Sequence, residues 1–131
     1  PELPATTLAS SCYELMFDYC TSLTTAPELP ATMLADYCYS RMFNGCTALT
    51  TFPVLPATTL ARGCYFAMFE NCTSLNHITC LATDISATDC TSNWVYKVSS
   101  AGTFVKHSDM TGWSTGTNGI PSGWTVVDAE V

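Results

Sequence analysis

The first 78 residues consist of three copies of one 26-residue motif, which begin at Pro1, Pro27 and Pro53. Fourteen of the 26 positions are identical in all three copies, including the positions of Leu8 and Phe17. A single copy of this length cannot bury its own apolar face, whereas stacked copies share a continuous core through contacts between neighbours. The period therefore predicts a solenoid in which equivalent side chains lie over one another.

Each copy contains two kinds of segment. Residues 23–26 are short, β-branched and bounded by Pro27, which favours a strand of three or four residues. Residues 6–20 carry apolar pairs at 8/9, 12/13 and 16/17, a spacing of four rather than the 3.6 of a straight helix. We expect a helical segment here that bends, or breaks into two short pieces, on the outer side of the coil.

A fourth copy begins but does not continue the pattern. Leu81 and Cys90 align with Leu3 and Cys12, but a Trp-Val pair at 94/95 replaces the Met-Phe pair of the earlier copies. Residues 94–98 and 103–106 alternate in period two about a turn, which predicts a β-hairpin, and residues 124–127 predict a third strand. We therefore expect a solenoid over residues 1–93 and a small antiparallel β cap over residues 94–131 that closes its end.

The run Cys-Tyr-x-x-Met-Phe-x-x-Cys-Thr-x-Leu-Thr-x-x-Pro-x-Leu-Pro-Ala-Thr resembles the BspA-type leucine-rich repeats of surface proteins from gut and oral bacteria and some protists. Residues 100–106 and 119–126 are similar to the ending that such proteins often carry. The resemblance implies an α/β, right-handed leucine-rich-repeat solenoid, with short parallel strands on one face and helical segments on the other. It also implies a secreted or surface-anchored protein that binds host or bacterial partners, and it supplies no catalytic residues.

Composition narrows the classes of partner. The formal net charge is -7 with only four Lys and Arg, which argues against nucleic acid and against an anionic membrane surface. No apolar run approaches the roughly 18 residues that a membrane span needs, and we expect no secretion signal within these residues. Threonine and serine supply most of the polar surface, which suits an extracellular location. Because Pro1 opens a repeat without a polar cap, we expect further coils upstream and end-to-end self-association through residues 1–26.

The eight cysteines favour neither a metal site nor disulfides within the repeats. On a helix, Cys12 and Cys20 would lie about 12 Å apart, beyond the roughly 7 Å limit for a bridge. Equivalent cysteines on packed helices would lie about 8 to 10 Å apart, and C-x7-C without a nearby histidine matches no zinc pattern. We predict buried free thiols in the repeats, whereas Cys80 and Cys90 remain open to a disulfide that would staple the end of the solenoid.

The sequence contains no catalytic signature. His77 and His107 are the only histidines and no G-x-S-x-G elbow is present, so we expect no enzyme, no cofactor and no metal. We expect a non-enzymatic extracellular or cell-surface module that binds a protein partner through its repeat surface. The alternatives are a structural spacer or stalk and a carbohydrate-binding module, whose sugar would stack on a loop tryptophan. The candidate binding residues are Thr24, Thr25, Thr50, Thr51, Asn76, His77 and Trp113.

Overall fold

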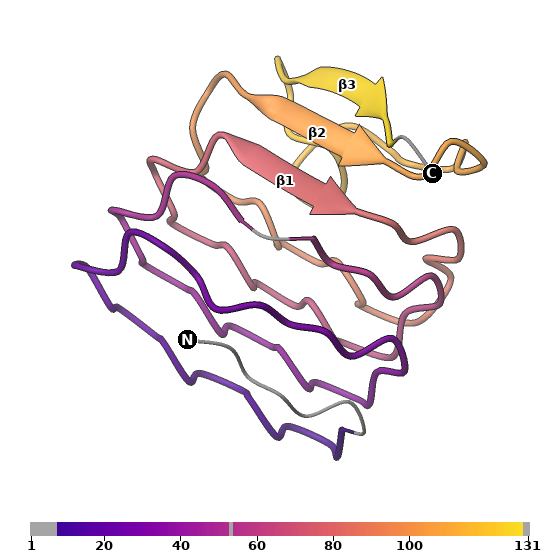
Figure 1. Ribbon diagram of the computed structural model, residues 1–131, viewed down its shortest axis with the longest axis horizontal. Coiled ribbons are helices and arrows are strands. Elements are labelled where there is room, and N and C mark those ends of the chain that lie inside the picture. Colours follow the sequence, from indigo (N-terminus) through magenta and orange to yellow (C-terminus); the bar gives the residue numbers. More distant parts are fainter. Residues whose placement is uncertain (1–7, 53, 130–131) are drawn as a thin grey trace.

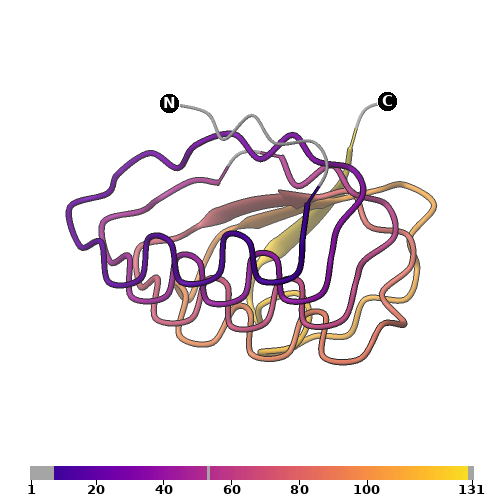
Figure 2. The same ribbon diagram turned by 90° about the horizontal axis from the view of Figure 1, so that it is seen from below.

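The structure is a computed structural model that describes residues 8–52 and 54–129. In it the backbone winds into coils that lie over one another, with a sheet along one side of the stack and a regularly undulating segment along the other (Figures 1 and 2). Contacts between residues one repeat apart connect each coil to the next, as the pairing below shows.

Three short parallel strands form one sheet: β1 (His77–Cys80), β2 (Thr103–Lys106) and β3 (Thr125–Asp128), in the order β1-β2-β3. In this sheet His77 pairs with Thr103, and Thr103 pairs with Thr125. Single parallel bridges from Thr25 to Thr51 and from Thr51 to His77 extend the same ladder into the preceding coils. The sheet side of the molecule therefore joins successive coils in one register.

The other side of each coil is a series of tandem turns, which we call the turn ribbon; it covers residues 9–20, 35–46, 61–72 and 87–98. In the first coil, Cys12 N–H donates to Ala9 O at 3.2 Å and Met16 N–H to Tyr13 O at 3.2 Å. The third residue of every second turn has a positive φ, between 49° and 76° across the four ribbons. That conformation at the third position is the geometry of a type II turn.

Alternate N–H groups of the turn ribbon donate to the next coil instead of to their own. Phe17 N–H donates to Met42 O at 2.9 Å, and Phe43 N–H donates to Met68 O at 3.0 Å. Between these donors lie the N–H groups that close the turns, so the two sets together pair the backbone of the ribbon. Within the first three ribbons, all these backbone N–H donors point in one direction, from each ribbon to the one that follows it.

The predicted helical segments are wrong, because the described residues contain no helix. The physical reason is the spacing of four. A helix would rotate the apolar stripe by about 40° at each step of four residues, at 100° per residue, whereas a turn that repeats every four residues returns each apolar pair to the same side. The class expected from the resemblance, an α/β leucine-rich-repeat solenoid with helical segments, is corrected accordingly.

The predicted antiparallel cap is also wrong. β2 pairs in parallel with β1, and β3 in parallel with β2, across the expected boundary at residues 93/94. Residues 94–97 form no strand but continue the turn ribbon, with positive φ at Asn93 and Lys97. A short period-two pattern does not distinguish parallel from antiparallel pairing, and the Trp94–Val95 pair simply takes the place of the Met-Phe pair in a fourth ribbon.

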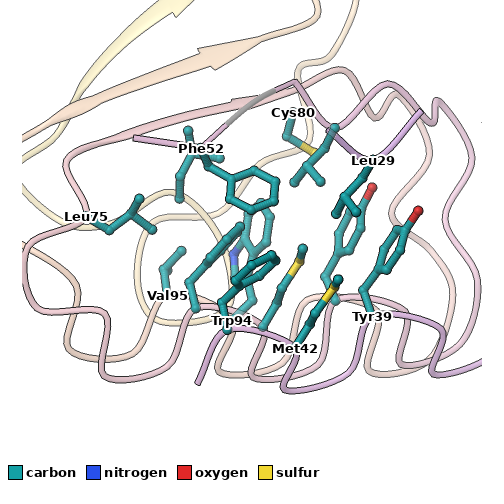
Figure 3. Close-up of a cluster of buried hydrophobic side chains, with 14 of the residues drawn as sticks. Leu29, Tyr39, Met42, Phe52, Leu75, Cys80, Trp94 and Val95 are labelled. Atoms are coloured by element: carbon teal, nitrogen blue, oxygen red, sulfur yellow. The ribbon is translucent and has the colours of Figure 1, made fainter. Parts of the chain in front are cut away.

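Aromatic columns form the core between the ribbon and the sheet (Figure 3). The ring centroids of Phe17 and Phe43 are 5.4 Å apart, those of Phe43 and Phe69 are 6.2 Å apart, and Trp94 continues the column 6.1 Å from Phe69. A parallel column stacks Tyr39 at 6.1 Å from the equivalent tyrosine of the next coil. Phe43 is thus covered by its equivalents on both sides, whereas Phe69 is covered by Phe43 on one side and on the other by Trp94, which holds the repeat position of Met68.

The thiols form a third set of columns, and all eight cysteines are free. Cys80 and Cys90 are both buried and form no bridge with each other. Cys46 Sγ donates to Phe17 O at 3.1 Å, so the thiol of one ribbon hydrogen-bonds to the backbone of the preceding ribbon. Cys12 differs from the other repeat cysteines because it is exposed at the first coil.

Candidate functional site

The outer face of the sheet, which points away from the core, carries one polar residue from each coil. Ile78 and Phe104 are completely buried beneath the sheet, so the residues that alternate with them point outward. These residues form what we call the outer row. It consists of Thr25, Thr51, His77, Thr103 and Thr125, which are joined in register by parallel pairing.

The members of the outer row are reachable from solvent and carry no fixed charge. Thr25, Thr51 and Thr125 are exposed, whereas His77 and Thr103 are half-buried. Neighbouring strands lie about 4.8 Å apart, so the row presents side-chain hydroxyls and one imidazole at a regular interval. Each hydroxyl can both donate and accept a hydrogen bond. The row is therefore suited to contacts with an extended polar surface.

A second line of polar residues precedes the outer row in each coil. Thr24, Thr50 and Asn76 are exposed, and Asn76 N–H donates to Thr50 O at 2.9 Å. Gly102 holds the next position, where a Cβ atom would lie 2.5 Å from Asn76 O. Because this close approach leaves no room for a side chain, the line of polar side chains stops at Asn76.

The outer face also has an apolar part. Thr79 pairs with Val105, and Val105 with Val127, so two valines follow a threonine in a row parallel to the outer row. At the far edge, Lys106 Nζ lies 2.6 Å from Asp128 Oδ1, and this ion pair is the charged feature closest to the valines along β2 and β3. The face is thus mixed rather than uniformly polar.

Thr103, Thr125 and the valine row are not among the residues that the sequence predicts for the site, because the pattern over residues 94–131 predicts an antiparallel cap. A usable signal exists for Thr103. It lies 26 residues after His77, as His77 lies 26 residues after Thr51. Continuing the repeat spacing past the point where the motif itself fades would have added it to the row. Thr125 breaks the spacing and has no such signal.

Trp113 lies apart from the outer row. Its ring stacks on Trp94 with centroids 5.5 Å apart and meets the edge of Phe104 at 5.3 Å, so it packs on the core side of the sheet. Its Nε1 is buried and has no hydrogen-bond partner among the described residues. One face of the ring is therefore covered by Trp94, which leaves at most the other face for a ligand.

Other groups offer little reactive chemistry. No group of three or more His, Cys, Asp or Glu within residues 8–52 and 54–129 is arranged to hold a metal ion. Burial raises the pKa of the Cys46 thiol to about 11 and those of Cys38, Cys72 and Cys80 to about 12. Because the thiolate is the reactive form, these thiols are inert near neutral pH.

A hollow of about 380 Å³ lies beside the sheet and is lined in part by Asp84, Ser86, Asp109 and Met110. Asp84 Oδ1 accepts hydrogen bonds from Ser86 N–H at 2.9 Å and from Ser86 Oγ at 2.6 Å, and these bonds lower the pKa of Asp84. The carboxylate is therefore already engaged in a local turn.

The chain matches no protein-family model, no curated protein and no solved structure. Within the described ranges, no helix has the length and apolar character to cross a membrane. What defines the class of the molecule is therefore its own architecture, in which turn ribbons are stacked on one side and a parallel ladder runs along the other.

Proposed function

We propose that this protein is a non-enzymatic interaction module of the cell surface or extracellular space, which binds a protein partner through the outer face of its sheet. The observation that carries the proposal is the outer row, in which uncharged polar side chains from successive coils are joined in one register from Thr25 to Thr125. Stacked coils commonly use such extended surfaces for binding.

The physical support lies in preorganisation. Threonine is β-branched and has a stiff χ1, so it loses little side-chain freedom when a partner orders it. Parallel pairing also fixes the backbone of every residue in the outer row before a partner arrives, which reduces the entropic cost of association. A neutral row on a chain with net charge -7 further suits a partner with basic groups around a polar centre.

End-to-end self-association through the first repeat remains a prediction, to which the hydrogen-bond direction adds a condition. The first turn ribbon donates its alternate N–H groups to the second, for example from Tyr13 to Cys38 O at 3.0 Å. The outer edge of the first ribbon is therefore lined by carbonyl acceptors. Two such edges have no donors to exchange, so a partner for this edge must supply N–H or O–H groups.

The location outside the cell rests on composition and on the resemblance to bacterial surface repeats, with Thr and Ser supplying most of the polar side chains. The buried thiols are compatible with an oxidising compartment, since burial keeps them protonated and inaccessible to oxidants. Cys12 is the exposed exception and is the thiol expected to react first.

The experiment compares two triple variants of the full chain on arrays of candidate surface proteins and of glycans. T25A/T51A/H77A removes the predicted contacts, and T47A/T73A/T88A removes three exposed threonines that lie outside the sheet. We expect a protein partner to bind the wild type and the second variant, and to bind the first at least about tenfold more weakly. Equal binding by both variants would favour the spacer, and binding confined to the glycan array would favour the carbohydrate module.

A further inference from the structure

Among the residues that the structure describes, the last strand of the sheet has one unpaired edge. β3 is the last strand of the sheet, and its Thr125 N–H donates to Gly102 O at 2.8 Å and its Ala129 N–H to Lys106 O at 2.7 Å. Because successive residues of a strand direct their N–H and C=O groups to opposite sides, those of Val126 and Asp128 face away from β2. None of the described residues pairs with them.

The exposure of β3 sets it apart from the other strands. All four of its residues are exposed, whereas β1 and β2 consist of buried and half-buried residues. Val126 and Val127 are each 42% exposed although both are apolar and β-branched. An exposed edge with unpaired backbone groups and apolar side chains is a template for pairing with another strand.

We infer that β3 is a homodimer interface, in which a second copy of the chain pairs antiparallel with β3 across a two-fold axis. In this register Val127 lies opposite the partner's Val127, and Val126 lies opposite the partner's Asp128. Val126 and Asp128 each exchange N–H and C=O bonds with the opposing residue. The two sheets then become one continuous sheet, which extends the β1-β2-β3 ladder that the structure already contains.

Self-complementarity is what selects a second copy as the occupant. A strand edge presents both donors and acceptors, so two identical edges satisfy one another under two-fold symmetry. The outer edge of the first turn ribbon, at the other end of the stack, presents backbone acceptors only, so two first ribbons cannot pair with each other through their backbones. The two ends of the stack therefore differ in the partner that each can accept.

Electrostatics at the edge permits the pairing. Asp128 is held by Lys106 at 2.6 Å, and in the proposed register it faces a valine rather than a second carboxylate. The net charge of -7 on each copy opposes association at long range. Because salt screens such repulsion, the dimer strengthens as ionic strength rises.

The experiment measures the mass of the full chain by sedimentation equilibrium over a range of protein and salt concentrations. Val126→Pro removes the outward N–H from both copies while leaving the N–H bonds from β3 to β2 in place, and proline is tolerated in an edge strand. Val126→Thr is the matched control that keeps the N–H. We expect the wild type and Val126→Thr to dimerise, and Val126→Pro to have a dissociation constant at least about tenfold higher.

A second pair of variants tests the same interface without proline, so a folding defect caused by proline does not decide the result. Val127→Lys places two like charges at the two-fold axis and should abolish the dimer at low salt, whereas Val105→Lys places the same charge one strand away and should leave the dimer. A wild type that remains monomeric at every concentration overturns the inference. So does a dimer that Val126→Pro and Val127→Lys leave as tight as the wild type, since it must then form through another surface.

Discussion

The turn ribbon and the outer face of the sheet follow the same 26-residue spacing, but residues at equivalent positions repeat more closely in the ribbon than on the outer face. On the ribbon, the residues that point inward recur almost unchanged: Cys12 and Cys38 are equivalent, as are Phe17 and Phe43. On the outer face, Thr24 is followed by Thr50 but then by Asn76. The ribbon positions bury their side chains between coils and tolerate little change, whereas the outer positions contact solvent. Stability should therefore be concentrated in the ribbon and the core, and binding on the outer face.

The largest expected effect concerns the buried thiols and is a loss of stability at alkaline pH. Burial raises the pKa of Cys46 from 9.0 to about 11, and those of Cys38, Cys72 and Cys80 to about 12. Between pH 9 and these raised pKa values, the folded chain keeps thiol protons that the unfolded chain has lost. The stabilisation is therefore complete below about pH 9 and is lost as the pH rises, by about 1.4 kcal/mol per pH unit for each group.

Urea unfolding with a reductant present, from pH 7 to pH 11, measures this effect. We expect a flat stability up to about pH 9 and a steep fall above it. Cys46→Ala removes one of the groups and should reduce the slope of the fall. A stability that stays constant to pH 11 would show that the thiols are not desolvated, and it would contradict the packing of the ribbon against the core.

The next effect is the loss of a ring from the aromatic column. Phe43 is completely buried, stacks between Phe17 and Phe69, and meets the edge of Phe52 with centroids 5.0 Å apart. Phe43→Ala should lower the free energy of unfolding by about 3–5 kcal/mol, as for other large-to-small core substitutions. Chemical denaturation measures it. A decrease in the free energy of unfolding of less than about 1 kcal/mol would mean that the aromatic column contributes little to the stability of the stacked coils.

The repeat period predicts which side chains lie over one another, but it does not predict the backbone that holds them. Equivalent positions 17, 43 and 69 stack as the spacing requires. The spacing of four within each copy excluded a regular helix, yet we expected a distorted one, because residues such as Leu15 and Arg41 carry no turn signal and adopt positive φ all the same. Hydrogen bonds to the next coil compensate for that conformation, and such long-range bonds cannot be predicted from local sequence.

The candidate site was predictable only where the motif itself persists. Thr25, Thr51 and His77 were found because they occupy one repeat position, and Thr103 continues the same spacing. Beyond the motif, β2 and β3 continue the parallel ladder, and Trp94 extends the phenylalanine column into a fourth ribbon. Both are contacts between residues far apart in the sequence, and a local period-two pattern carries no information about them.

A smaller effect is expected at the glycines of the ribbon. Gly45 has a φ of 76°, and a Cβ added there would lie 2.5 Å from Cδ1 of Tyr19. Gly45→Ala should cost about 1–2 kcal/mol, because left-handed backbone is unfavourable for alanine, while the exposed Tyr19 ring can move aside. Gly112→Ala is the control, since its Cβ would meet Met110 Cε at an ordinary 3.5 Å. Thermal unfolding of both variants makes the comparison, and equal melting temperatures would contradict the turn geometry.

The smallest expected effect lies on the outer face. Thr51 is exposed, and in the described structure its side chain donates no hydrogen bond to another residue, so only its backbone takes part in the ladder. Thr51→Ala should therefore change the free energy of unfolding by no more than about 0.5 kcal/mol, as is usual for surface positions. Denaturation of Thr51→Ala beside Phe43→Ala tests the contrast between the two regions directly. A loss for Thr51→Ala close to that of Phe43→Ala would mean that the outer face is part of the scaffold, and the reason for assigning binding to it would be gone.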